Sequence, residues 1–176
     1  MGSLNNVDLD KISKTISAGK ADKSTLLKPV KLQGQWMLNG ESSFQFKTEL
    51  AFEKGTQVLE IDSPSFLGGS GNRLGPMAYC IAGITSCFIG TFASIAANQG
   101  VVLTKLGVST QCNTNFAKTL DVADEPIVDK IEFKIDAKSS NASKEQLDSI
   151  LKMALDRCPA MYSMSHIIPV HASITE

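Results

Sequence analysis

The chain has 176 residues, of which 43% are hydrophobic and 20% charged, and its net charge is −1. This length and composition are typical of a single folded domain and exclude a disordered chain or a coiled-coil rod. The near-neutral charge and the aromatic content of 6% argue against a nucleic-acid-binding protein, which would carry basic side chains and stacking rings.

The N-terminus and the cysteine content indicate a cytoplasmic protein. The first residues, MGSLNNVDLDKISK, lack the apolar stretch of a secretory signal. Four cysteines in 176 residues are too few for a disulfide scaffold. We therefore expect reduced cysteines, with structural, metal-binding or redox roles.

The N-terminal half predicts a helix followed by an antiparallel meander. Sparse apolar residues within positions 1–25 indicate a weakly amphipathic helix, which we interpret as an N-terminal helical extension. Strands and the turns that join them are expected at Lys28–Trp36, Asn39-Gly40, Phe44–Leu50, Lys54-Gly55 and Val58–Ile61.

A long apolar helix is predicted from Pro76 to about Asn98, because proline suits the first helical position and Gly100 follows the end. About 23 residues would extend for roughly 35 Å, which is enough to cross a membrane. The internal threonines, serines and glycines, and the lack of Trp or basic anchors at both ends, argue against a membrane span. We expect no membrane association and a helix buried on nearly all sides, in a domain or dimer core.

The C-terminal half predicts two strands, a second helix and a last strand. The strands are expected at Val101–Cys112 and Ile127–Ala137, and the last one at Ile167–Ile174. A capping box of Ser143 and Gln146 begins the helix, Pro159 interrupts it, and residues 160–164 restart it. The order α-βββ-α-ββ-α-β predicts an α+β fold with antiparallel sheet, as one domain over residues 26–176.

The cysteines are the candidate functional residues. Cys80 and Cys87 lie on one helix about 10.5 Å apart along its axis, too far apart for a disulfide with each other. Cys158 ends the apolar face of the second helix, which is formed by Leu147, Ile150, Leu151, Ala154 and Leu155. Two inward-facing cysteines, Cys87 and Cys158, can form a reversible dithiol, although a buried cysteine can also simply fill space.

Other chemistries have weaker support. The sequence has no C-x₂-C motif, no histidine pair at helical spacing and no G-x-S-x-G motif, so a zinc site and a hydrolase are not indicated. The glycine-rich loop at residues 66–75 lacks the residues of a phosphate-binding P-loop. Because it leads into a helix, an anion site at the helix N-terminus stays open as an alternative.

Two segments resemble the OsmC/Ohr family of osmotically induced and organic hydroperoxide resistance proteins. The block Pro76–Phe88, PMAYCIAGITSCF, is similar to the family's N-P-E-x-L…A-A-C-F, and the block from Ala154 to Pro159 is similar to its A…C-P. The resemblance covers about residues 30–174. It implies an OsmC-like intertwined homodimer, in which antiparallel sheets wrap around two long central helices.

The resemblance also implies a thiol-dependent peroxidase without a bound cofactor. Cys87 would attack an organic hydroperoxide and become a sulfenic acid, and Cys158 would condense with it to a disulfide. An external thiol, either a dihydrolipoyl group or a small thiol such as coenzyme A, would reduce the pair.

The chain departs from the family pattern where the family activates its thiolate. No arginine precedes Arg73, and Asn72 and Met77 stand where glutamates are expected. We expect Arg73, or Lys47 from the meander, to supply the activating cation. The alternative is a dimeric module that binds a small thiol or acyl ligand beside Cys87 without turnover.

Overall fold

The structure is a computed structural model that describes residues 2–40 and 42–175. The chain forms two compact units, residues 15–82 in one and residues 2–14 together with 83–175 in the other. Two helices continue from one unit into the other: α1, Leu9–Ala21, and α2, Pro76–Asn98.

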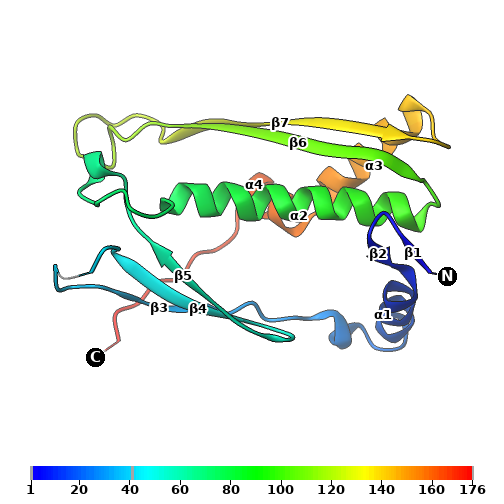
Figure 1. The fold of residues 1–176 in the computed structure, drawn as a ribbon, viewed down its shortest axis with the longest axis horizontal. Helices are drawn as coiled ribbons and strands as arrows, with labels where there is room; N and C mark the ends of the chain where they lie inside the picture. The colour runs from blue at the N-terminus through cyan, green and yellow to red at the C-terminus, as the bar shows by residue number, and fades with distance from the viewer. Residues whose placement is uncertain (1, 41, 176) are drawn as a thin grey trace. The chain divides into compact units, whose positions relative to one another are not determined.

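The unit of residues 15–82 contains a three-stranded antiparallel sheet in the order β3-β4-β5 (Figure 1). The strands are β3, Gln33–Trp36, β4, Phe46–Phe52, and β5, Gly55–Ile61. Phe52 pairs with Gly55, so the predicted turn at this place is confirmed. Two 3₁₀ helices, Lys23–Leu26 and Ser65–Leu67, flank the sheet in sequence.

Two sequence predictions in this unit are wrong in detail. The strand expected from Lys28 begins only at Gln33; Pro29 has no N–H to give to a ladder, so the chain before β3 stays unpaired. Trp36 pairs with Phe46, so the link between β3 and β4 is longer than the predicted two-residue turn at Asn39-Gly40.

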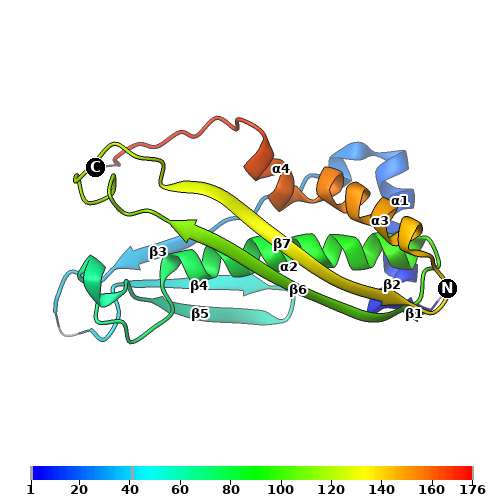
Figure 2. The same cartoon turned by 90° about the horizontal axis from the view of Figure 1, so that it is seen from above.

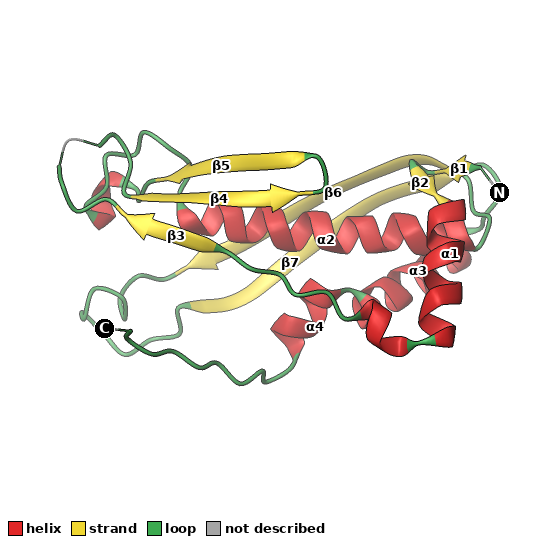
Figure 3. Cartoon of the chain, turned by 90° about the horizontal axis from the view of Figure 1, so that it is seen from below, coloured by secondary structure: helices red, strands yellow, loops and turns green. Residues whose placement is uncertain are grey.

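The other unit combines a long two-stranded ribbon with helices. The ribbon consists of β6, Leu103–Thr114, and β7, Val128–Ser139, paired antiparallel. It runs along the part of α2 that belongs to this unit, from Gly83 on (Figure 2). Two further helices, α3, Lys144–Arg157, and α4, Pro159–Ser165, follow the ribbon in the chain (Figure 3).

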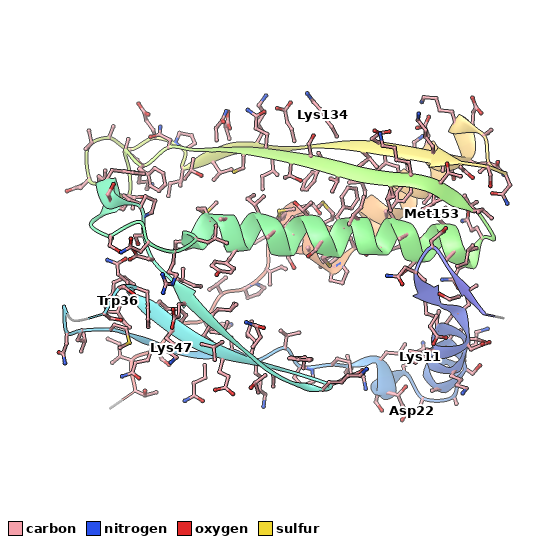
Figure 4. All side chains as sticks on the ribbon, in the orientation of Figure 1. Lys11, Asp22, Trp36, Lys47, Lys134 and Met153 are labelled. Atoms are coloured by element: carbon pink, nitrogen blue, oxygen red, sulfur yellow. The ribbon has the colours of Figure 1, made fainter. Side chains whose placement is uncertain are left out.

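The core of this unit lies between the ribbon, α2 and the two C-terminal helices. Alternate residues of β7 point inward, whereas Lys134 points away from α2 (Figure 4). The buried side chains of this core come from α2, the segment after it, α3, the α3–α4 junction and α4, and they are Phe88, Phe92, Ala96, Val101, Ile150, Ala154, Cys158 and Met161. Burial of these apolar groups is the main force that holds the elements together.

Local signals place the helices as predicted. Helix α2 begins at Pro76 and ends at Asn98, and Gly100 adopts the left-handed conformation, with φ of 70°, that glycine allows after a helix. The Ser143–Gln146 capping box is present at α3. Helix α4 starts at Pro159, so the predicted interruption and restart are also confirmed.

A short N-terminal hairpin precedes α1. Strands β1, Ser3–Leu4, and β2, Val7–Asp8, are joined through Asn5 and Asn6, whose positive φ values of 53° and 61° suit a tight hairpin turn. The Asn5 amide donates to the Val101 carbonyl at 2.8 Å and accepts from the Leu103 amide at 2.9 Å. The hairpin is thereby attached to the start of β6; the predicted domain boundary at residues 25–26 stays a prediction.

The last predicted strand is wrong. Residues 167–175 follow α4 without regular structure, and Ile167, Val170 and Ile174 are almost fully exposed. The alternation of apolar residues predicted the extended conformation, but a strand also needs a neighbour with which to share hydrogen bonds.

The elements define an α+β fold with antiparallel sheets, as predicted from the sequence. The intertwined homodimer stays a prediction. Helix α2 has the length and apolar composition of a membrane span, but core helices meet the same criteria.

Candidate functional site: two cysteines at a helix junction

The structure brings Cys87 and Cys158 together, with their sulfur atoms 3.5 Å apart. Cys87 lies near the middle of α2. Cys158 is the single residue between α3 and α4, so it caps the C-terminus of α3 and the N-terminus of α4. The break at Pro159 places Cys158 at this junction, because proline ends one helix and suits the first turn of the next. The two sulfurs are within S–H···S hydrogen-bond distance and are both free thiols.

The other two cysteines do not join this pair. Cys80 is exposed, and Cys112 is half-buried in β6. Both are free thiols.

The two thiols differ in exposure. Cys158 is completely buried, with 0% of its surface exposed, whereas Cys87 is only partly buried. A molecule that arrives from solvent therefore reaches Cys87 more readily than Cys158.

The two thiols also differ in acidity. Burial is the largest influence on Cys158 and raises its pKa, but hydrogen bonds from the Met161 amide, Cys87, the Thr91 hydroxyl and the Ala160 amide outweigh it and lower the pKa of Cys158. The pKa of Cys87 is raised, mainly by burial and also by its neighbour Cys158, with only the Ala160 amide acting in the other direction.

Thr91 is the residue at this site that sequence reasoning did not select. Its hydroxyl donates to the Cys87 carbonyl at 2.9 Å, one turn back along α2, and its closeness to Cys158 contributes to the lowered pKa of that thiol. The four-residue spacing from Cys87 was a visible signal, since residues i and i+4 share one face of a helix.

Arg73 lies in the unit of residues 15–82, where its guanidinium binds Glu60. Its Nε and Nη2 atoms each lie 3.1 Å from the Glu60 carboxylate, and Nη1 donates to the Asn72 carbonyl at 3.1 Å. Lys47, an exposed residue of β4 (Figure 4), stands opposite the same Glu60 in the sheet. A role for either cation at Cys87 stays a prediction.

The glycine-rich loop already encloses an anion of its own. The Asp62 carboxylate, only 2% exposed, accepts from the Ser70 amide at 2.9 Å, the Ser70 hydroxyl at 2.6 Å and the Asn72 amide at 3.2 Å. The Ser70 hydroxyl is the main cause of a lowered pKa at Asp62; burial opposes it, and the loop amides add to it. The Ser70 and Asn72 amides are thus occupied by an internal carboxylate, and the anion site at the start of α2 stays a prediction.

An apolar groove lies at Met161, three residues after Cys158. It has a volume of about 660 Å³ and is lined by residues of β7, α3 and α4: Val128, Asp129, Lys130, Ile131, Phe133, Leu155, Met161, Met164 and Ser165. Met161 belongs to both features, since its side chain lines the groove and its amide stabilises Cys158. In the described residues, no group of three or more histidine, cysteine or acidic side chains is arranged to hold a metal ion.

The fold and the site together define an α+β domain with a close dithiol between a long central helix and a helix junction. The sequence matches the OsmC-like protein family over residues 69–173, which include both cysteines, and the chain belongs to this family. The resemblance seen in the two sequence blocks is thus confirmed.

Solved structures of the family share the fold at low sequence identity. An OsmC-like protein from Mycoplasma pneumoniae is 16% identical, with a TM-score of 0.56 over 80% of this chain and 89% of that one. An OsmC-like protein of unknown function from Vibrio cholerae is 18% identical, with a TM-score of 0.54 over 78% and 94%. The organic hydroperoxide resistance protein OsmC from Legionella pneumophila is 16% identical, with a TM-score of 0.53 over 78% and 91%. No protein of curated function matches the chain.

Proposed function

We propose that this protein is a thiol-dependent peroxidase that reduces organic hydroperoxides with Cys87 and Cys158. The observation that carries the proposal is the 3.5 Å distance between the two sulfurs. A disulfide bond is about 2.05 Å long, so side-chain rotation and a small shift suffice to close it.

Cys87 is the attacking residue in this proposal, because it is the more accessible thiol. Its sulfur takes the distal oxygen of the hydroperoxide and becomes a sulfenic acid, while the alcohol leaves. Cys158 then attacks the Cys87 sulfur, water leaves, and a disulfide forms. A thiol reductant, a dihydrolipoyl group or a small thiol such as coenzyme A, returns the pair to the reduced state by thiol–disulfide exchange.

The apolar groove supports an organic peroxide over hydrogen peroxide as the substrate. Its walls offer aliphatic and thioether side chains for an alkyl or aryl group, and Met161 links the groove to Cys158. Structural neighbours that carry the description organic hydroperoxide resistance protein agree with this choice. We also propose that the protein works in the cytoplasm as a homodimer.

Counting thiols tests the proposal. Reduced protein is mixed with cumene hydroperoxide, and free thiols are counted over time. The wild type should lose two thiols per chain, and Cys158→Ser should lose one and bind a dimedone probe at Cys87. Cys112→Ala is the matched control and should behave as the wild type.

One observation favours a second candidate, the binding module. The raised pKa of Cys87 leaves its thiol protonated at neutral pH, and a protonated thiol is a poor nucleophile. If the wild type loses no thiols faster than free cysteine and Cys158→Ser traps no sulfenic acid, the peroxidase proposal is wrong. A thiol or acyl ligand held beside Cys87 would then be the function to pursue.

A further inference from the structure

A second cavity lies in the unit of residues 15–82. It has a volume of about 370 Å³, and its lining comes from the end of β3, the connection to β4, the glycine-rich loop and Asp62. Trp36 (Figure 4), Met37 and Phe44 supply its large apolar side chains. Trp36 is exposed, so the cavity can be reached from solvent. A cavity of this volume is at the lower end of the range for small-molecule sites.

The wall of this cavity holds a buried negative charge. Asp62 lines the cavity, and its carboxylate accepts from the amide and hydroxyl of Ser70 and from the amide of Asn72. The Ser70 hydroxyl is the main cause of the lowered pKa of Asp62, burial opposes it and the loop amides add to it, so the carboxylate is ionised at neutral pH. All of these donors are neutral, and they therefore stabilise the charge without cancelling it.

No cation of the chain cancels this charge. Among the described residues, no lysine or arginine forms an ion pair with Asp62, and Arg73 of the same loop binds Glu60 instead. No positively charged group is among those that shift the pKa of Asp62. Buried charges in proteins are normally paired, and an unpaired one projects its potential into the neighbouring cavity. The cavity is therefore a place where a positive charge is stabilised.

The wall that carries this charge is fixed by contacts within its own unit. The Gln45 side chain donates to the Gly68 carbonyl at 3.1 Å and accepts from the Ser63 amide at 3.1 Å. Gly69 packs so closely on Ser63 that a Cβ atom there would lie 1.9 Å from the Ser63 carbonyl oxygen. A ligand that enters the cavity does not have to order this wall, and preorganisation of this kind favours binding.

We propose that this cavity binds a small organic cation, a quaternary or protonated amine, with its positive charge between the Asp62 carboxylate and the rings of Trp36 and Phe44. Aromatic rings attract a cation that lies within about 6 Å of the ring centre, and tryptophan does so best. A metal ion fits this cavity less well, because Ca²⁺ or Mg²⁺ requires oxygen ligands at about 2.0–2.6 Å and the Asp62 carboxylate is already bound by three donors. The proposal goes beyond the peroxidase function and does not rest on it.

Fluorescence tests the proposal without any peroxide. Trp36 is the only tryptophan of the chain, so its emission reports on this cavity. The full-length protein is titrated with choline chloride and, separately, with 3,3-dimethylbutanol, which has nearly the same shape without the charge. Choline should change the emission in a saturable way, and the alcohol should bind about 10-fold more weakly or less. Equal binding of the two, or no saturable change with choline, would refute the proposal. The same change with CaCl₂ would assign a metal site instead and would also overturn it.

Two variants remove the two parts of the site. Phe44→Leu keeps an apolar side chain but removes a ring, and it should weaken choline binding by about 3- to 30-fold. Asp62→Asn keeps the shape but removes the charge, and it should abolish saturable binding. Glu53→Gln removes an exposed carboxylate of the same unit and is the matched control, with unchanged affinity.

Circular dichroism establishes that each variant is folded before it is titrated. If a folded Phe44→Leu or Asp62→Asn protein binds choline as tightly as the wild type, the proposal is wrong. If Asp62→Asn does not fold, the comparison of choline with the alcohol and the Phe44→Leu affinity decide the question.

Discussion

Phe88 of α2 packs edge-on against Phe133 of β7, with their ring centroids 5.3 Å apart and their planes at 65°. Phe88 is 1% exposed and follows Cys87 directly. The ring contact therefore fixes the rotation of α2 about its axis, and with it the direction of the Cys87 side chain.

The first prediction concerns this contact. Phe88→Ala should lower the free energy of unfolding by about 3–5 kcal/mol, since it removes a buried ring and leaves a cavity. Phe88→Leu should cost less, because it refills part of the space. Phe52→Ala, at a position 59% exposed, is the control. Denaturant unfolding measures all three, and an Ala variant as stable as the control would contradict the assigned core.

A second prediction separates the cysteines. Cys80→Ala should leave peroxide-dependent thiol loss nearly unchanged, because Cys80 is exposed and lies about 10.5 Å from Cys87 along the helix axis. Cys87→Ser should abolish it. Thiol counting after cumene hydroperoxide treatment provides the comparison, and equal losses in the two variants would refute the assignment of the pair.

A third prediction decides whether a cation activates Cys87. If Arg73 or Lys47 does so, Arg73→Ala or Lys47→Ala should slow oxidation at neutral pH and much less at pH 9, since a cation at about 4–6 Å shifts a pKa by 1–3 units. If neither side chain activates Cys87, both variants should react at the wild-type rate at both pH values. The outcome is read from the first oxidation rate of each variant.

The fourth prediction uses the Asp62 carboxylate in the glycine-rich loop. Its folded pKa is lowered, so its contribution to stability is present above the unfolded value of about 3.9 and is lost as the pH falls through the folded pKa. Asp62→Asn should lower the melting temperature at pH 7, and the difference from wild type should shrink in acid. Glu53→Gln, at an exposed turn, is the control. A difference that does not vary with pH would argue against the ionised carboxylate.

The fifth prediction is the homodimer. Over its most apolar window only 22% of α2 is buried within the chain, and a helix of this composition is normally covered on most sides. A second copy would supply the cover. Sedimentation equilibrium at micromolar concentration should give twice the chain mass, and a monomer there would contradict the prediction.

The elements that sequence reasoning located correctly are those with local signals. Pro76 and Gly100 mark the ends of α2, and Ser143 with Gln146 marks the start of α3. These signals act within a few residues, so no knowledge of the rest of the fold is required. The inward direction of Cys158 followed from the apolar face of α3 in the same way.

The features that were missed depend on distant contacts. The segment after His166 has the apolar alternation of a strand but pairs with no strand among the residues that the structure describes. The sequence of the glycine-rich loop did not predict that its amides would bind the Asp62 carboxylate. Thr91 lies near Cys158 only because α2 meets the junction of α3 and α4 at Cys87. Such contacts arise from tertiary packing, which spacing along one element does not encode.

Asn5 makes the N-terminal hairpin sensitive to chemical ageing. Its carboxamide both donates to Val101 and accepts from Leu103, whereas an ionised carboxylate can only accept. Deamidation to aspartate would leave the Leu103 bond intact but would set a carboxylate oxygen against the Val101 carbonyl. Spontaneous hydrolysis of this single amide would therefore weaken the attachment of the hairpin to the start of β6, without any break in the chain.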